Sequence, residues 1–146
     1  MKWVTRKYIR TNRLATAWLI RRFVDPASEF EFVEPTEVKN IQEREGAIGF
    51  DAPGALYSHD DGITSFERIL QDYKLADSVL QDLATIVHAA DIQGKLHLVA
   101  EAAGLQAISR GFPMVTQNDY ETLEKGFFLY DALYVSLKAR REGEDG

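Results

Sequence analysis

The chain has 146 residues, 45% of them hydrophobic and 27% charged, a composition typical of one globular domain. Its 17 basic and 23 acidic residues give a net charge of −6, which argues against a broad nucleic-acid-binding surface. The absence of cysteine excludes disulfides, thiolate metal sites, iron–sulfur clusters and cysteine nucleophiles. No apolar segment approaches the roughly 20 residues of a membrane span, and no signal peptide is apparent. We therefore expect a cytoplasmic protein without membrane association.

Strands and helices alternate in the first part of the predicted structure, and helices alone follow. Aromatic and β-branched residues, or alternation of polar and apolar residues, predict four short strands: residues 3–9, 29–33, 47–51 and 56–58. Helical patterns cover residues 13–24, 35–46, 65–74, 78–91, 96–110 and 117–141. We therefore predict a single α+β domain over residues 1–146. It has a small N-terminal sheet of about four short strands and a predominantly helical C-terminal body.

The first predicted helix begins with a capping residue and carries three arginines. Thr11 or Asn12 can accept a hydrogen bond from the first free backbone N–H groups. At about 100° per residue, Arg13 and Arg21 fall within a quadrant of each other, and Arg22 points elsewhere. The helix could hold one anion between Arg13 and Arg21, or pair these arginines with buried carboxylates of the same chain.

Histidines and carboxylates are the ligands available for a metal in a chain without cysteine. His88 and Asp91 are three residues apart on a predicted helix, so their side chains share a face, and His59 follows a predicted strand. Glu67 is a further possible ligand, although with Thr64 it also forms a capping box, which we favour. These residues predict a site for a divalent ion such as Zn, Fe or Mn. The alternative is a solvated helix face, with His88 placed favourably at a helix C-terminus.

Asp131 lies at the edge of the apolar stripe of the last predicted helix. An ionised carboxylate there is costly unless it is paired, so we predict a buried bridge to Arg13 or Arg21 that orients two helices. Trp18, in the apolar body of the first helix, has a predicted structural role. Asp51 could pair similarly or cap a turn.

Short stretches spread along the chain form an ordered pattern: residues 3–6, 13–23, 25–26, 46–48, 50–51, 53–54, 58–59, 65–66, 84–91, 102–105 and 130–134. Together they resemble the C-terminal domain of ChrB-type chromate-resistance proteins over nearly the full length. The resemblance implies a link to chromate stress, since full-length members are chromate-responsive regulators of a resistance operon. The N-terminal region of those regulators is expected to be missing, so DNA binding is not expected for this chain alone. Thr16 and Thr64 stand where family members often carry cysteine, so thiol-based chromate reduction is not expected either.

We expect a metal-binding domain that acts in the response to chromate or another oxyanion. A divalent ion would be held by His59, His88 and Asp91, with Glu67 or water, beside an anion site at Arg13 and Arg21. The alternative is a non-enzymatic regulatory domain that binds an oxyanion or a protein without metal. The sequence leaves open whether the protein is an enzyme. Candidate anions are chromate, sulfate and phosphate, and aromatic residues that could be exposed leave room for a homodimer.

Overall fold

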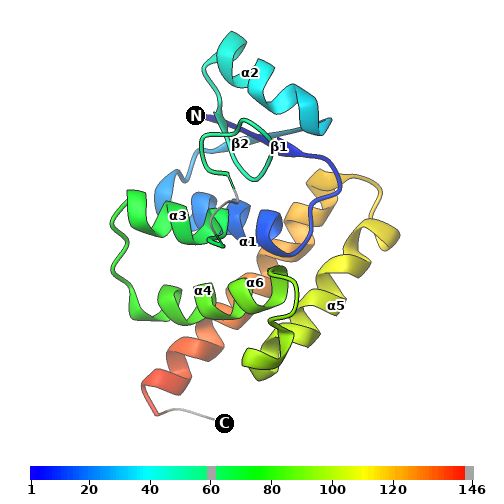
Figure 1. Cartoon of the computed structure of the whole chain (residues 1–146). Helices are drawn as coiled ribbons and strands as arrows, with labels where there is room; N and C mark the ends of the chain where they lie inside the picture. The colour runs from blue at the N-terminus through cyan, green and yellow to red at the C-terminus, as the bar shows by residue number, and fades with distance from the viewer. Residues whose placement is uncertain (59–61, 144–146) are drawn as a thin grey trace.

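A small parallel sheet lies at one end of the molecule and a helical body at the other (Figure 1). The computed structural model describes residues 1–58 and 62–143. The strands are β1 (Lys2–Arg6), β2 (Glu29–Val33) and β3 (Ile48–Gly49). The α-helices are α1 (Thr11–Leu19), α2 (Val38–Glu45), α3 (Ser65–Asp72), α4 (Ser78–Asp91), α5 (Ala100–Val115) and α6 (Asp119–Arg141). A π-helical turn (Ile20–Val24) extends α1, and 3₁₀ turns (Pro35–Glu37 and Leu96–Leu98) precede α2 and α5.

The sheet has the strand order β2-β1-β3, with both pairs parallel. Parallel neighbours need crossover connections, and α1 and α2 provide them. Side chains alternate along β1: Trp3 packs into the core that contains α1, whereas Val4 packs with Val38 and Ile41 of α2. The two crossover helices therefore cover opposite faces of the sheet. The chain leaves β1 toward β2 and later returns to the other side of β1, so the order reverses at β1.

The α+β class is confirmed, but the prediction of about four strands was wrong, because three strands form within the described chain. Of the predicted fourth strand, Tyr57 makes one isolated parallel bridge, to Phe50. The backbone turns at Asp51, where φ is +50°, so the chain leaves β3 without continuing the ladder. The Tyr57 ring stacks against Trp3 at a centroid distance of 6.5 Å and bonds α3 through Asp72. This segment therefore joins the sheet to the helical body.

Helix α1 is the centre of the helical body and contacts α3, α4, α5 and α6. Trp18 packs its ring against Phe23, Tyr130 and Tyr134, with centroids 5.6–6.0 Å apart. At Gly126, a Cβ atom would lie 2.5 Å from Leu14 Cδ1, so α1 and α6 approach closely there. In the described ranges, no helix has both the length and the apolar character that crossing a membrane requires.

The predicted cap at the start of α1 was wrong. Arg10 occupies the N-cap position, and its side chain makes no capping hydrogen bond. Asn12 is buried and instead hydrogen-bonds the first two residues of α3. Its Nδ2 donates to Ser65 Oγ at 2.8 Å, and its Oδ1 accepts from Phe66 N at 3.4 Å. Neither Thr11 nor Asn12 thus acts as the N-cap residue of α1.

Candidate functional site

The loop between β1 and α1 is held in place by the start of α6. The backbone N–H groups of Tyr8 and Ile9 donate to the Asp119 carboxylate at 3.1 and 2.8 Å. Tyr8 has a φ of +61°, so the loop turns sharply as it leaves the sheet. This turn places Arg10 at the start of α1 and Arg13 in its first turn.

Two arginines from different elements share the carboxylate of Asp51. The Arg6 and Arg13 guanidiniums lie 3.4 Å from the same Asp51 oxygen, Oδ2, and Arg6 Nε also donates to the Asp51 carbonyl at 2.7 Å. Arg13 Nη2 donates to the Tyr8 carbonyl at 3.0 Å. The Arg13 and Asp51 side chains are only 12% and 6% exposed. Both contacts with Oδ2 are long for charge-assisted hydrogen bonds, which are usually below about 2.9 Å.

Arg13 is an electrostatically costly residue in this position. Burial lowers the pKa of its guanidinium, and repulsion from Arg6 and Arg10 lowers the pKa further, against the attraction of Asp51. Its Nε atom is buried and has no hydrogen-bond partner among the described residues. An additional negative charge next to Arg13 would offset both costs.

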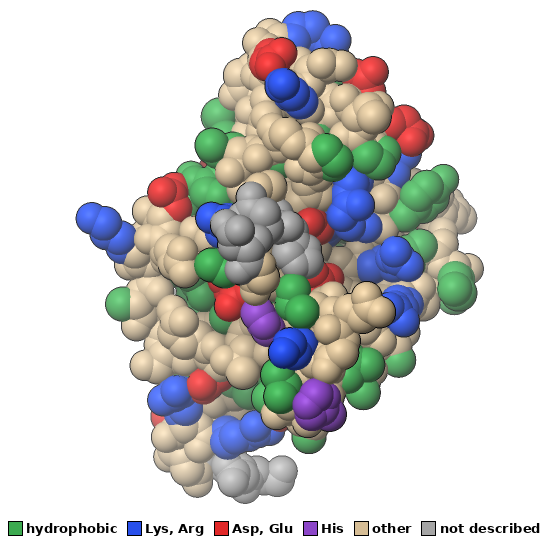
Figure 2. All heavy atoms as spheres, viewed as in Figure 1, with side chains coloured by type: hydrophobic (Ala, Val, Ile, Leu, Met, Phe, Trp, Pro, Cys, Tyr) green, Lys and Arg blue, Asp and Glu red, His purple; other side chains and the backbone are tan. Residues whose placement is uncertain are grey.

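A polar cavity of about 210 Å³ opens beside Arg13. We call it the arginine cavity, and its polar wall consists of Arg10, Thr11, Arg13, Asp91, Gln106 and Arg110. These side chains come from the start of α1, the last residue of α4 and one side of α5. Figure 2 shows basic side chains gathered on the face where α5 passes the start of α1. Since a water molecule occupies about 30 Å³ in the liquid, the cavity has room for a small ion with some of its hydration.

The wall of the arginine cavity has an excess of positive charge: three arginines face one carboxylate, Asp91, within its described lining. Arg10 and Arg110 make no side-chain hydrogen bond or ion pair within the part of the chain that the structure describes. Guanidiniums present several N–H donors in a planar fork that matches tetrahedral oxyanions. The arrangement can therefore bind a small anion.

Two larger cavities lie nearer the sheet. One, of about 440 Å³, lies beyond the carboxyl ends of β1 and β3 and is lined by Arg6, Asp51, Pro53 and Ser58 among others. This is the place where the strand order reverses and where open parallel sheets usually bind ligands. Arg6 and Asp51 link it to Arg13 and hence to the arginine cavity.

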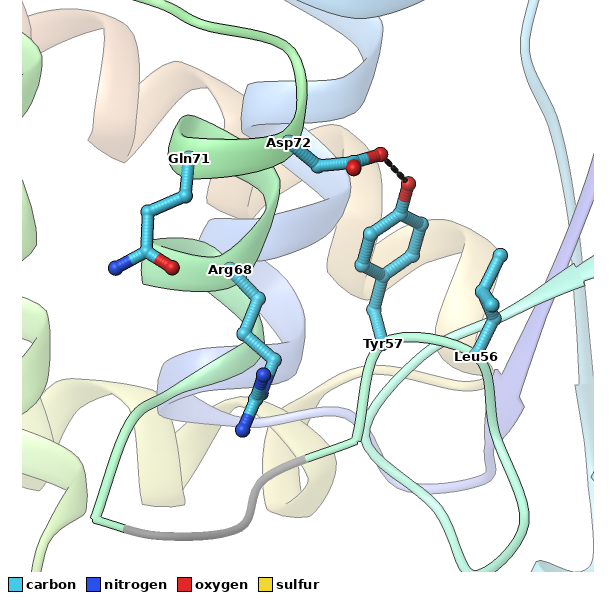
Figure 3. A pocket seen from close by; sticks show the side chains of 5 residues that line it. All are labelled: Leu56, Tyr57, Arg68, Gln71 and Asp72. Carbon is cyan, nitrogen blue, oxygen red and sulfur yellow. Dashed lines mark hydrogen bonds between the residues drawn. The ribbon is translucent and has the colours of Figure 1, made fainter.

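The other larger cavity, of about 460 Å³, is lined by Leu56, Tyr57, Arg68, Gln71 and Asp72. Figure 3 shows Asp72 extending from the end of α3 to the Tyr57 hydroxyl, which donates to it. Burial and this bond raise the pKa of Tyr57. Because the phenol and the carboxylate already pair with each other, we assign this contact a structural role.

The structure brings together two of the predicted metal ligands, His88 and Glu67. His88 Nδ1 lies 2.8 Å from Glu67 Oε1, and the predicted capping box of Thr64 and Glu67 is confirmed. Asp91 lies in the wall of the arginine cavity. Among residues 1–58 and 62–143, no three His, Asp or Glu side chains form a group that could hold a metal. His59 lies outside the described residues, so the metal site stays a prediction.

The two arginines of the predicted anion site bind different partners. Arg21 donates to the Ser28 hydroxyl and carbonyl, both at 2.8 Å, and its guanidinium lies over the rings of Phe30 and Phe127. Arg13 and Arg21 are separated by about 12 Å along the helix axis, at 1.5 Å per residue. Arg21 thus joins the helix to the sheet. Of the two arginines of the predicted anion site, Arg13 alone lines the arginine cavity as the structure describes it.

The prediction that Asp131 pairs with Arg13 or Arg21 in a buried bridge was wrong. Asp131 accepts from Nε and Nη2 of Arg22, each at 2.9 Å, and from Trp18 Nε1 at 2.8 Å. Its side chain is 43% exposed. Trp18 and Arg22 are four residues apart, so their side chains lie on the same side of the helix. This spacing explains why Arg22, rather than Arg13 or Arg21, joins Trp18 in binding Asp131. The ion pair between Arg22 and Asp131 still joins the π-helical turn at the end of α1 to α6.

Three arginines of this region were not identified from the sequence: Arg6, Arg10 and Arg110. A usable signal existed for two of them, because Arg6 ends a predicted strand and Arg10 comes just before a predicted helix. The carboxyl end of a parallel strand and the start of its crossover helix lie at the same edge of a sheet. Nothing in the local sequence predicts that Arg110 of α5 reaches this edge.

The family model described as "ChrB, C-terminal domain" matches residues 3–137. The chain belongs to the ChrB C-terminal domain family. It is similar to Protein ChrB of Cupriavidus metallidurans, with 34% identity over 142 residues, which are 97% of this chain and 42% of that protein. This ChrB C-terminal domain thus spans less than half the length of the curated relative that it matches. No solved structure matches the chain.

Proposed function

We propose that this ChrB C-terminal domain binds a small oxyanion, chromate first of all, in the arginine cavity, and that this binding serves the response to chromate. The proposal rests on one observation: three guanidiniums surround a cavity whose described wall contains one carboxylate. The link to chromate comes from the resemblance to ChrB-type chromate-resistance proteins, and the chain's membership of the ChrB C-terminal domain family supports it.

Arg13 is the centre of the proposed site. Its side chain is buried, and its Nη1 atom lies 3.4 Å from Oδ2 of Asp51, which is long for an ion pair. Electrostatic attraction is stronger away from bulk water, so an oxyanion in the cavity would interact strongly with this group. It would also relieve the repulsion among Arg6, Arg10 and Arg13 that acts on the guanidinium.

The start of α1 adds to the attraction. The first N–H groups of a helix carry a partial positive charge, and the side chain of Arg10, the N-cap residue of α1, does not cap them. Thr11, in this first turn, belongs to the cavity wall. Backbone N–H groups and guanidiniums can then share the oxygens of one tetrahedral anion.

Binding would have a mechanical consequence, because the cavity wall comes from α1, α4 and α5. An anion that contacts all three helices binds the folded state and not the unfolded chain, so it stabilises their arrangement. Such a change is a suitable signal for a regulatory domain.

Calorimetric titration with sodium chromate, together with thermal unfolding, tests the proposal. We expect chromate to raise the melting temperature of the wild type and of Arg44→Gln, whose guanidinium is exposed and, among the described residues, pairs only with neighbouring Glu45. Arg110→Gln, on the exposed side of the cavity, should keep its fold and bind at least about tenfold more weakly. Arg13→Gln should abolish binding. Equal chromate affinity in the wild type and in Arg110→Gln would contradict the proposal.

The contact between Glu67 and His88 supports a second candidate function, the binding of a divalent metal ion. If His88 Nδ1 donates to Glu67, its Nε2 can ligate a metal, and a carboxylate in this role orients the imidazole. Glu67 would then position the ligand rather than bind the ion. Elemental analysis of protein purified without added metal tests this: an ion should be lost in His88→Ala, reduced in Glu67→Gln and retained in His97→Ala. A wild type without metal would contradict it.

A further inference from the structure

We infer that Asp91 makes the arginine cavity selective for oxyanions that carry a proton. The inference rests on the proposed function and deepens it by naming the class of anion. Asp91 is the carboxylate in the described wall of a cavity that otherwise presents Arg10, Arg13, Arg110, Gln106 and Thr11. A site that attracted every anion equally would need no negative charge in its wall.

The position of Asp91 in its own helix is also unfavourable. It is the last residue of α4, where the free carbonyl groups carry partial negative charge and an acidic side chain destabilises the helix. The energetic reason for a carboxylate at this point therefore lies outside α4. The positive charge of the arginines of α1 and α5 in the same cavity wall favours a carboxylate here. A bound ligand that donates a hydrogen bond to Asp91 would favour it as well.

An ionised carboxylate accepts hydrogen bonds and donates none. An oxyanion that has lost every proton meets repulsion from Asp91, whereas one that keeps an O–H group donates it to the carboxylate while its other oxygens accept from the arginines. Near neutral pH every phosphate ion carries at least one proton and part of the chromate population carries one, but sulfate carries none. The two oxygens of a carboxylate offer about four acceptor sites, so contacts of Asp91 within the protein are compatible with this bond.

The charged groups around the cavity within the described structure are guanidiniums and carboxylates. Arg10, Arg13 and Arg110 face the cavity, and Arg6 and Asp51 lie behind Arg13. The buried Tyr130 hydroxyl donates to the Thr11 carbonyl, and burial raises its pKa, so it stays protonated. Selectivity thus depends on the proton that the ligand carries.

Calorimetric titrations of the full chain at pH 7 with sodium phosphate, chromate and sulfate test the inference. We expect the wild type to bind phosphate and chromate at least about tenfold more tightly than sulfate, the size of one hydrogen bond to a charged group. In Asp91→Asn the amide can donate to an unprotonated oxygen, so sulfate affinity should rise and the preference should fall to about threefold or less. Asp82→Asn, on the same helix but paired with Arg141, is the matched control and should keep the wild-type preference.

Equal binding of sulfate and phosphate by the wild type would overturn the selectivity and leave the proposed function intact. A tenfold preference that survives in Asp91→Asn would overturn the role of Asp91. Failure to bind any of the three anions would overturn the proposed function itself. If Asp91→Asn does not fold, Asp91→Ser, which also removes the charge and supplies a hydroxyl donor, takes its place in the same titrations.

Discussion

Arg13 Nη1 lies 3.4 Å from Oδ2 of Asp51, and Arg6 approaches the same oxygen at the same distance. One carboxylate thus serves two guanidiniums, and neither contact has the length of a strong ion pair. Arg13 could therefore contact a further anion without breaking a short ion pair with Asp51. If the domain binds an oxyanion as proposed, we expect its stability to depend on the anion concentration.

Asp51→Asn removes the shared charge and should destabilise the fold by about 2 kcal/mol, since breaking a buried pair leaves a cation without compensation. Asparagine tolerates the left-handed φ of +50° at this position, so the change isolates the charge. Urea unfolding measures the loss, and added phosphate should recover more stability in Asp51→Asn than in the wild type. Glu34→Gln, which breaks an exposed pair with Lys7, should change stability by less than about 1 kcal/mol. Wild-type stability in Asp51→Asn would refute this prediction.

Asp131→Asn should lower stability in a pH-dependent way. The bond from Arg22, followed by that from Trp18, holds the pKa of Asp131 below its usual value, so the carboxylate stabilises the fold above the unfolded pKa near 3.9. This stabilisation is lost as the pH falls through the folded-state pKa. Because both side chains are about two-fifths exposed, we expect a difference of roughly 0.5–1 kcal/mol at pH 7. Denaturation at pH 7, 5 and 3 should show that difference shrinking between pH 5 and 3, and a constant difference would disprove the link.

Gly126→Ala should destabilise the domain although alanine is the better helix former. The new Cβ atom would lie 2.5 Å from Leu14 Cδ1 in a packed interface, and overpacking of this kind costs about 1–3 kcal/mol. Gly104→Ala is the matched control, because no described residue outside its own helix lies within 4 Å of its added Cβ. Replacing that glycine should raise stability by up to about 1 kcal/mol. Thermal unfolding of both variants checks the prediction, which fails if the two shift in the same direction.

Asn12→Ala should weaken the junction between α1 and α3. Asn12 is buried, and its loss leaves Phe66 N and Ser65 Oγ without this partner, at a cost of about 1–3 kcal/mol. Asn40→Ala removes an exposed amide that bonds only Glu37 in the described structure, so its effect should be near zero. Equal stability of the two variants in urea would mean that the buried bonds contribute little.

Periodicity predicted the elements well where one face is buried against the core. Helix α4 spans residues 78–91 as predicted, and Gly46 ends α2 with a φ of +68°. The capping box at Thr64 and Glu67 forms because both partners are local. The cap at Asn12 did not form, because a partner 53 residues away competes for the same amide. A local sequence pattern does not show that a residue far along the chain competes for the capping side chain.

The candidate site was predictable only in part for the same reason. Arg13 was identified from its helix, but the companions that make it part of a cavity come from β1, α4 and α5. Arg21 has the same chemistry and nearly the same helical face, and yet Ser28 and two aromatic rings engage it. Asp91 was predicted as a metal ligand from its spacing to His88, whereas its surroundings depend on where α5 packs. Side-chain chemistry is visible in the sequence, but tertiary neighbours are not.

The contact between Leu14 and Gly126 also has a consequence for biosynthesis. Within this domain α1 is synthesised before the other helices that contact it, and α6, whose Gly126 packs against Leu14, is synthesised after them. Until α6 emerges, the side of α1 that packs against α6 has no native cover, and the nascent chain is exposed to aggregation or chaperone capture during that interval. Shortening the protein at its far end would therefore damage the segment that carries Arg13, more than 100 residues upstream.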